Sequence, residues 1–502
     1  MRYTSTDAVK RHAPFLMIFL AGLLLRVWTI GYGTNVDEGD YLMQGREMTH
    51  GYWPYRDVHL NKPPLVSFLA YPFFLVFNIP IIPARIFMIA VSASALAALY
   101  GLGRLCGEER GGLLAAGFFA FDPFAAVWAK YLHVSTLAPV LSLWALVCFL
   151  WGMKSQRRIG LMLSGVFAAL CLLNKQTGVI VLPALFFAFL LFENRRWRDW
   201  QWFLLGFFPL PLLLIFYLAL LNAFEPFFYD IYYSNFAMAD FFNQSAAARW
   251  GEFLAVEYWN PIAWYGIAAG LVIMALKRRR YLIWLIVWFS LEFGVNIFAL
   301  SHIWQHYVLA IMPSAFALSG LGLAALLDWA PLRRRLSEPA NRWLPAVMAL
   351  ILTAPFWMRA DWRYPNMTLE DERGFAAQIA RHCPSPYLLC FANAAYFMLT
   401  DKEVPPSIRH GRKVRIPPFM NTAGRKYLSL EDMKKTVELW RTLPMDYCVM
   451  YDKYARQIFI DQDPHLEPVR QFLENDFERA PNLSKNLRTY YAHMICFARK
   501  RN

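Results

Sequence analysis

The sequence of 502 residues is poor in charge, since only 17% of them are Asp, Glu, Lys or Arg. It contains no internal repeat, no P-loop and no glycine pattern of a dinucleotide-binding turn. Its seven cysteines show no spacing typical of a metal site. These absences argue against a repeat protein, the common nucleotide-binding folds and a zinc module. The low charge also argues against a soluble globular protein.

Apolar residues are what the chain has instead. They make up 58% of the sequence, with 41 Phe and 19 Trp, and the mean hydropathy is +0.31. A helix that crosses a membrane needs about 17–25 apolar residues. Eleven stretches approach or reach that length: 14–32, 84–103, 112–129, 137–153, 159–173, 178–192, 202–221, 261–276, 281–300, 306–327 and 343–357. The composition therefore predicts a polytopic α-helical membrane protein with about 11 transmembrane helices.

One further apolar segment, 65–77, is too short to span and is followed by Pro80 and Pro83, which break helices. We predict an interfacial helix there, on the outer side. At the N-terminus Arg26 interrupts the apolar run, and no small-residue cleavage site follows it, so we expect an uncleaved first helix rather than a signal peptide.

The formal net charge of +14 suggests nucleic acid until its distribution is considered. With the N-terminus inside, every predicted inner loop is basic, as the positive-inside rule requires. These loops hold Arg2, Lys10, Arg11, Arg104, Arg110, Lys154, Arg157, Arg158, Arg195, Arg196, Arg198, Lys277–Arg280, Arg333, Arg334, Arg335 and Arg342. We predict an integral protein of the bacterial inner (plasma) membrane with a cytoplasmic N-terminus, and no nucleic-acid partner.

The predicted domains are a transmembrane catalytic domain, 1–357, and an outer-side (periplasmic or extracellular) soluble α/β domain, 358–502. In the second, capping boxes predict helices at about 369–381 and 430–441, a further helix is predicted at 467–475, and strands are predicted at 387–391, 447–451 and 490–498. The Pro-rich, basic stretch 404–418 is predicted to be a loop. An oxidising compartment allows one disulfide among Cys383, Cys390, Cys448 and Cys496.

Candidate chemistry lies in the first outer loop, 33–83, where an acidic cluster precedes Lys62 by about two dozen residues. A carboxylate can take a proton from an acceptor hydroxyl, and a lysine can stabilise negative charge on a departing phosphate. Other polar residues are predicted at the same membrane face, namely Lys130, His133, Asn174, Lys175, Gln176, Ser301, His302, Gln305 and His306. Arg26 either snorkels or contacts a lipid phosphate or the acidic loop.

The motifs in this loop carry a resemblance to a known family. Asp37-Glu38-Gly39-Asp40-Tyr41, Gly51-Tyr52-Trp53-Pro54 and Lys62-Pro63-Pro64-Leu65 resemble the first outer loop of integral-membrane glycosyltransferases with the GT-C fold. The similarity is greatest to the branch that uses polyprenyl-phosphate sugars: protein O-mannosyltransferases, lipid A aminoarabinose transferases and lipid A galacturonosyltransferases. Leu173–Gly178 with Pro183, and His306–Pro313, resemble further motifs of that branch. The resemblance covers roughly residues 14–330.

The resemblance implies a reaction and roles for individual residues. A sugar would pass from a polyprenyl-phosphate donor to an envelope lipid, glycan or protein by an inverting displacement, with Asp37 as general base and Glu38 beside it. Lys62 and Lys175 match lysines around the donor phosphate, and Lys130 and Arg26 are further candidates. Candidate substrate-binding residues are Tyr41, His59, Asn61, His133, Asp240, His302, His306 and Tyr307.

Departures from the family pattern predict chemistry without a metal cofactor. Asn61 stands where the aminoarabinose transferases have Glu, and 134–138 lacks the acid that many members carry. The loop 229–259 lacks the Glu-His pair of some relatives and offers Tyr232, Tyr233, Asn235 and Asp240 instead.

Other interpretations remain open. The loop acids could be solvated or cap a helix, the lysines could be interfacial anchors, and the histidines could be packing residues. A transporter or flippase of lipid-linked sugar is disfavoured because no duplicated halves are visible and charge collects at one membrane face. An inactive assembly subunit is the remaining alternative.

Overall fold

The structure is a computed structural model. It describes residues 5–192, 196–233, 245–255, 280–299, 305–327, 338–357, 368–382, 385, 387, 389–391, 405, 407–409, 412–415, 429–445, 447–451, 466–479 and 494–500. Contacts between residues divide the chain into two compact units. The first is Met1–Ile30, Arg85–Tyr217 and Ala239–Trp362, and the second is Gly31–Ala84, Leu218–Met238 and Arg363–Asn502. The first outer loop thus groups with the C-terminal region.

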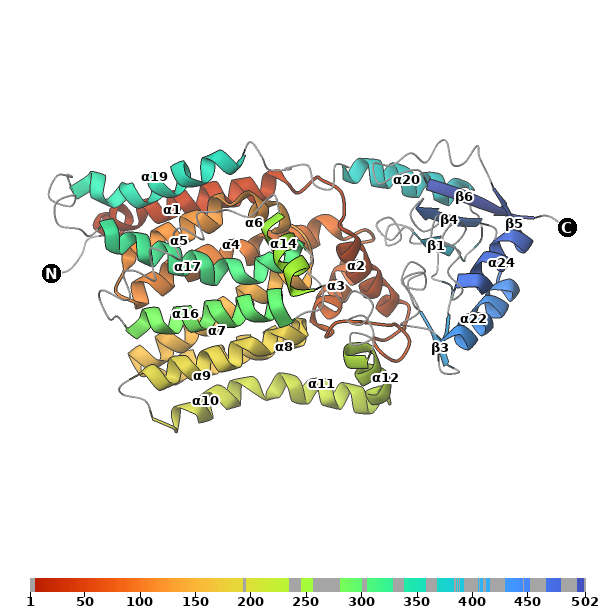
Figure 1. Cartoon of the computed structure of the whole chain (residues 1–502), viewed down its shortest axis with the longest axis horizontal. Helices are drawn as coiled ribbons and strands as arrows, with labels where there is room; N and C mark the ends of the chain where they lie inside the picture. The colour runs from red at the N-terminus through yellow and green to blue at the C-terminus, as the bar shows by residue number, and fades with distance from the viewer. Residues whose placement is uncertain are drawn as a thin grey trace. The chain divides into compact units, whose positions relative to one another are not determined.

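The first unit is a helical bundle whose main helices run side by side (Figure 1). Its elements are α1 (Ser5–Trp28), α4 (Ile81–Leu105), α5 (Glu109–Phe121), α6 (Pro123–Trp128), α7 (Val134–Ser155), α8 (Arg158–Asn174), η1 (Gln176–Ile180), α9 (Val181–Leu191), α10 (Asp199–Phe207), α11 (Pro209–Leu220), α14 (Ala246–Ala255), α16 (Arg280–Phe293), η3 (Gly294–Ala299), η4 (Gln305–Tyr307), α17 (Val308–Leu327) and α19 (Glu338–Trp357). Helices α5 and α7 are buried along nearly their whole lengths and form the core. Both helices have apolar residues on all sides, as a helix surrounded by other helices requires.

Three helices of the described residues are long and apolar enough to cross a membrane: Ile81–Leu105, Val134–Ser155 and Asp199–Leu220. Six further predicted spans coincide with shorter apolar helices, and 261–276 lies outside the described residues. The prediction of eleven full spans is therefore confirmed only in part. Along the last long helix, Leu212, Leu213 and Phe216 are exposed, and lipid would cover such side chains.

The predicted span 112–129 is wrong as a single helix, because it breaks at Asp122. That residue is extended, precedes Pro123, and its carboxylate accepts the Ala125 N–H at 2.7 Å. A residue before proline disfavours helix, and Asp is a good N-cap, so α5 ends and α6 begins there. The break leaves carbonyls at the end of α5 without helical partners.

The second unit contains α2 (Val36–Thr49), α3 (Leu65–Val76), α12 (Phe224–Phe228), η2 (Tyr229–Tyr233), α20 (Leu369–His382), α22 (Leu430–Thr442), α24 (Glu467–Asp476), β1 (Leu389–Phe391), β2 (Ser407–Arg409), β3 (Arg412–Val414), β4 (Tyr447–Tyr451), β5 (Phe477–Arg479) and β6 (Met494–Arg499). One sheet has the order β1-β4-β6-β5, with β1 parallel to β4 and the other pairs antiparallel. The helix α3 matches the short helix predicted at 65–77.

The predicted N-terminal caps of these two helices are present. Thr368 and Asp371 exchange hydrogen bonds at the start of α20, and the Ser429 hydroxyl accepts the Asp432 N–H at the start of α22. The hydrogen bonds from Thr368 lower the pKa of the exposed Asp371 carboxyl. The side chains of the four outer cysteines lie outside the described residues, so the possible disulfide stays a prediction.

The prediction of a loop at 404–418 is wrong in part. Strands β2 and β3 lie within it and pair antiparallel, with Ile408 opposite Lys413. Strands of three residues are too short for an alternating pattern to be recognised in the sequence.

Helix α2 packs against α3 at Gly45. A Cβ atom added to Gly45 would lie 2.5 Å from Ala70 Cβ and 2.9 Å from the Ala70 carbonyl carbon. We expect Gly45→Ala to destabilise the protein by about 1–3 kcal/mol, because backbone must move to admit the methyl group. Gly101→Ala on α4 is the control, since nothing lies within 4 Å of its Cβ position. Thermal unfolding of the two variants in detergent tests this expectation. Melting temperatures equal to that of the parent for both variants would contradict this packing.

Candidate active site

The N-terminus of α2 presents the predicted catalytic carboxylate. Asn35 caps the helix, and its side-chain oxygen accepts the Asp37 N–H at 2.9 Å. Asp37 is half-buried in the first turn, where the helix dipole favours a negative charge. The neighbouring Glu38 is completely buried. Of the two acids, Asp37 is the one with solvent access.

Asp40, which the sequence interpretation did not single out, is a third acid of this helix and is buried. Gln44 Nε2 donates to its Oδ2 at 3.0 Å, while Ser67 Oγ donates to Gln44 Oε1 at 2.5 Å. Its Oδ1 accepts no hydrogen bond within the described part of the chain. Burial, then the charge of Asp37, raises the pKa of Asp40 well above its usual value of 3.8. One turn of helix therefore carries Asp40, whose burial favours the protonated form, and Asp37, whose place at the helix N-terminus suits a negative charge.

This shift gives stability a pH dependence with a definite sign. The folded protein keeps the Asp40 proton above pH 3.8, where the unfolded chain loses it, so the contribution to stability falls as pH rises. We expect Asp40→Asn, which mimics the neutral acid, to raise the melting temperature more at pH 8 than at pH 5. Melting both proteins at the two pH values tests this; an equal difference at both would show that Asp40 does not hold its proton in the folded state.

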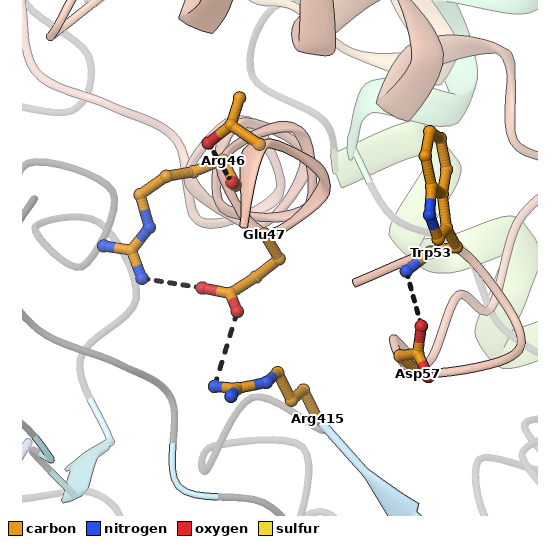
Figure 2. Close-up of polar contacts among 6 residues, drawn as sticks. Arg46, Glu47, Trp53, Asp57 and Arg415 are labelled. Atoms are coloured by element: carbon orange, nitrogen blue, oxygen red, sulfur yellow. Dashed lines mark hydrogen bonds and ion pairs between the residues drawn. The ribbon is translucent and has the colours of Figure 1, made fainter. Parts of the chain in front are cut away.

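Lys62 lies at the end of a loop that folds on itself. Asp57 Oδ2 accepts the Trp53 N–H at 2.8 Å (Figure 2), and Tyr55, in a left-handed conformation with φ 66°, donates its hydroxyl to the Lys62 carbonyl at 2.9 Å. Burial lowers the pKa of the Lys62 ammonium, and the negative charge of Asp37 opposes that shift. The carboxylate and the cation predicted to act together thus influence each other within one unit.

Asp230, at the start of η2, anchors the same loop and was missed in the sequence. Its Oδ1 lies 2.9 Å from His59 Nδ1, both side chains being fully buried, and its Oδ2 accepts the Leu60 N–H at 3.3 Å. His59 therefore serves the loop as a buried partner of Asp230. Of the other candidates here, Tyr41 is buried and Asn61 half-buried.

Within the first unit, the structure brings several predicted residues together. Lys175 Nζ lies 4.2 Å from the Tyr307 ring centroid and 3.5 Å from Ser135 Oγ. The rings of His133 and His306 have their centroids 4.7 Å apart. His133 Nδ1 also accepts the Ser135 N–H at 3.0 Å and caps α7. A cation, two imidazoles and a phenol from separate segments thus form one polar cluster.

Lys130 is also completely buried in the first unit, with Nζ 4.5 Å from the Tyr131 ring centroid. Asp240 and His302 lie outside the described residues. Tyr232 and Tyr233, offered by the loop after α11, are exposed on η2.

The expectation that Arg26 contacts a phosphate or the acidic loop is not supported. Its side chain is fully buried and donates to the carbonyls of Phe119 at 2.9 Å and Ala120 at 3.2 Å, and to Ser92 Oγ at 3.1 Å. These carbonyls belong to the last turn of α5, before the break at Asp122. Arg26 thus caps a helix end inside the bundle.

The architecture is the GT-C fold that the motifs predicted, and the chain shares it with the solved structures described below. Residues 61–221 match the profile of the family described as dolichyl-phosphate-mannose-protein mannosyltransferase. No curated protein matches the sequence.

Solved structures share the fold at low sequence identity. ArnT from Cupriavidus metallidurans bound to undecaprenyl phosphate is 14% identical with a TM-score of 0.60, over 99% of this chain and 98% of that one. The apo oligosaccharyltransferase of Archaeoglobus fulgidus is 14% identical with a TM-score of 0.61, over 93% and 73%. The same organism's AglB, in complex with an inhibitory peptide and a dolichol-phosphate, is 12% identical with a TM-score of 0.60, over 95% and 74%.

Proposed function

We propose that this protein is a membrane glycosyltransferase that moves a sugar from a polyprenyl-phosphate donor to an envelope lipid, glycan or protein. The observation that carries the proposal is that one compact unit holds both Asp37, half-buried at a helix N-terminus, and the partly desolvated Lys62 ammonium, whose pKa the charge of Asp37 influences. The family profile over residues 61–221 and the polyprenyl phosphates bound by ArnT and AglB support the choice of donor.

In the proposed reaction Asp37 removes the proton from an acceptor hydroxyl. The acceptor oxygen then forms a bond to the anomeric carbon, while the bond from that carbon to the phosphate oxygen breaks. The electron pair leaves with the polyprenyl phosphate, and the anomeric configuration inverts. A base at the acceptor and a cation at the leaving phosphate each lower the barrier, because charge develops at both ends.

Lys62 suits the phosphate because its ammonium has lost part of its hydration. A desolvated cation interacts more strongly with a phosphate than a hydrated cation does. The bound phosphate in turn favours the protonated form of Lys62. Because burial raises the pKa of Asp40, this acid adds less negative charge near the proposed phosphate site than an ordinary aspartate would. We further propose that Lys175, Lys130, His133, His306 and Tyr307 supply substrate contacts.

The test is transfer by the purified protein in liposomes, with a panel of undecaprenyl-phosphate sugars and separate lipid, glycan and peptide acceptors. We expect one acceptor to gain a sugar of inverted configuration, with an equal amount of undecaprenyl phosphate released. Movement of intact donor between leaflets without release would favour the flippase. If no donor–acceptor pair gave either sugar transfer or donor movement, the inactive assembly subunit would be favoured.

The metal requirement, the topology and the inner-membrane location stay predictions. Repeating the transfer assay after removal of divalent ions by a chelator tests the first of them, because metal-independent chemistry would keep its rate.

A further inference from the structure

Arg415, far along the chain from the first outer loop, pairs with that loop through its backbone. Its N–H donates to the Asp57 carbonyl at 2.7 Å, and its carbonyl accepts the His59 N–H at 3.2 Å. These bonds form a parallel bridge to Val58. Arg415, the residue that follows β3, thus forms an isolated β-bridge with the loop that leads to Lys62.

The side chain of Arg415 reaches a different element. Its Nη1 lies 3.5 Å from Glu47 Oε2, and its guanidinium carbon lies 3.6 Å from the Tyr52 ring centroid. The other oxygen of Glu47 accepts from Arg46 Nη2 at 2.8 Å (Figure 2). All three charged residues are buried, with exposed fractions of 6% or less. An ion pair buried to this extent fixes geometry, since breaking it leaves a charge without compensation.

Glu47 belongs to the last turn of α2, the helix that presents Asp37 in its first turn. Arg415 therefore contacts both the helix of the proposed base and the loop of the proposed phosphate ligand. Two further hydrogen bonds of the same loop lie next to Lys62: the Tyr55 hydroxyl donates to the Lys62 carbonyl, and Asp230 accepts the Leu60 N–H.

We infer that Arg415 is a positioning residue that sets the placement of Lys62 relative to Asp37 and so tunes the site for the phosphate of a polyprenyl-phosphate ligand. The inference rests on the proposed function for the identity of that ligand. It assigns the C-terminal region a part in donor binding.

Binding of undecaprenyl phosphate by the purified protein in detergent tests this without requiring turnover. We expect Arg415→Gln to raise its Kd about tenfold, a size typical of coupled contacts. Arg412→Gln is the matched control, because Arg412 is exposed and lies 4.0 Å from the exposed Glu225. It should bind like the parent.

A double-mutant cycle separates positioning from general loss of structure. If the ion pair transmits the effect, Arg415→Gln should weaken binding less than twofold once Glu47→Gln is present. Arg415→Lys, which keeps the charge and the backbone bonds, should give an intermediate Kd and covers the case in which Arg415→Gln fails to fold. In active protein, the donor KM should rise while the acceptor KM stays within twofold.

An unchanged Kd in both Arg415 variants, or fully additive effects in the cycle, would overturn the inference. Failure of the proposed function looks different, because the parent would then bind or transfer nothing and Asp37 variants would behave as the parent does.

Discussion

Asp37→Asn is expected to lower the rate of sugar transfer by about 10²–10⁴-fold, the usual contribution of a positioned general base. Asparagine keeps the shape and the helix position but cannot accept the acceptor's proton. Because Lys62 is untouched, the donor KM should stay within about twofold, so the loss falls on kcat. Initial rates over a range of donor concentrations measure both constants.

The matched control for this variant is Asp57→Asn, which changes an acid on the Lys62 side of the same unit. The Asp57 carboxylate accepts hydrogen bonds from the Trp53 N–H and from Nε of the exposed Arg56. Loss of this carboxylate should therefore loosen the loop and raise the donor KM instead. If Asp37→Asn transferred sugar at the parent's rate, Asp37 would not be the base.

Lys62→Met has the second large effect that we expect. Methionine keeps most of the side-chain volume and removes the charge, so the leaving phosphate loses its fixed cation. Removal of one such electrostatic contact costs about 10²–10³ in rate. The donor KM should rise as well, because the ground-state phosphate also interacts with the ammonium. Transfer kinetics and binding of undecaprenyl phosphate together measure the two losses.

Lys435→Met provides the comparison for a lysine outside the proposed site. Lys435 lies on the exposed face of α22, where its pairing with Glu431 raises its pKa. Its replacement should change neither the rate of sugar transfer nor the donor KM. Equal kinetics for Lys62→Met and Lys435→Met would remove Lys62 from the site.

Local signals in the sequence predicted much of the α/β region. The boxes at Thr368 and Ser429 are self-contained, because cap and helix lie within four residues of each other. The strand at 447–451 and the helix at 467–475 likewise have enough apolar residues in a fixed period to be recognised. The long apolar runs predicted the bundle for the same reason.

One local signal was missed. The Asp-Pro pair at 122–123 marks the break between α5 and α6, but averaging hydropathy over a window obscures it.

Features that depend on partners distant in the sequence were not predictable. That Arg26 would bind the freed carbonyls depends on α1 packing against α5, about ninety residues away. The pairing of Glu47 with Arg415, and of His59 with Asp230, is likewise set by packing rather than by spacing.

The sequence was enough to predict several residues of the candidate site, but not the role of each one. Asp37 and Lys62 follow from the motif, whereas the protonated state favoured for Asp40 requires knowing that its side chain is buried beside Asp37. Glu38, the next acid in the sequence, is fully buried whereas Asp37 is half-buried, a difference that the motif does not reveal.

A side-by-side assay of Asp37→Asn and Asp40→Asn tests the central claim most directly. Both substitutions remove one carboxylate from the same helix, three residues apart. The assay measures undecaprenyl phosphate released per mole of folded protein with the donor that the parent uses. We predict that Asp37→Asn loses release by at least about a hundredfold, while Asp40→Asn, a mimic of the neutral acid, stays within about threefold of the parent. Comparable losses in both variants, or a loss confined to Asp40→Asn, would contradict the assignment of Asp37 as the ionised base.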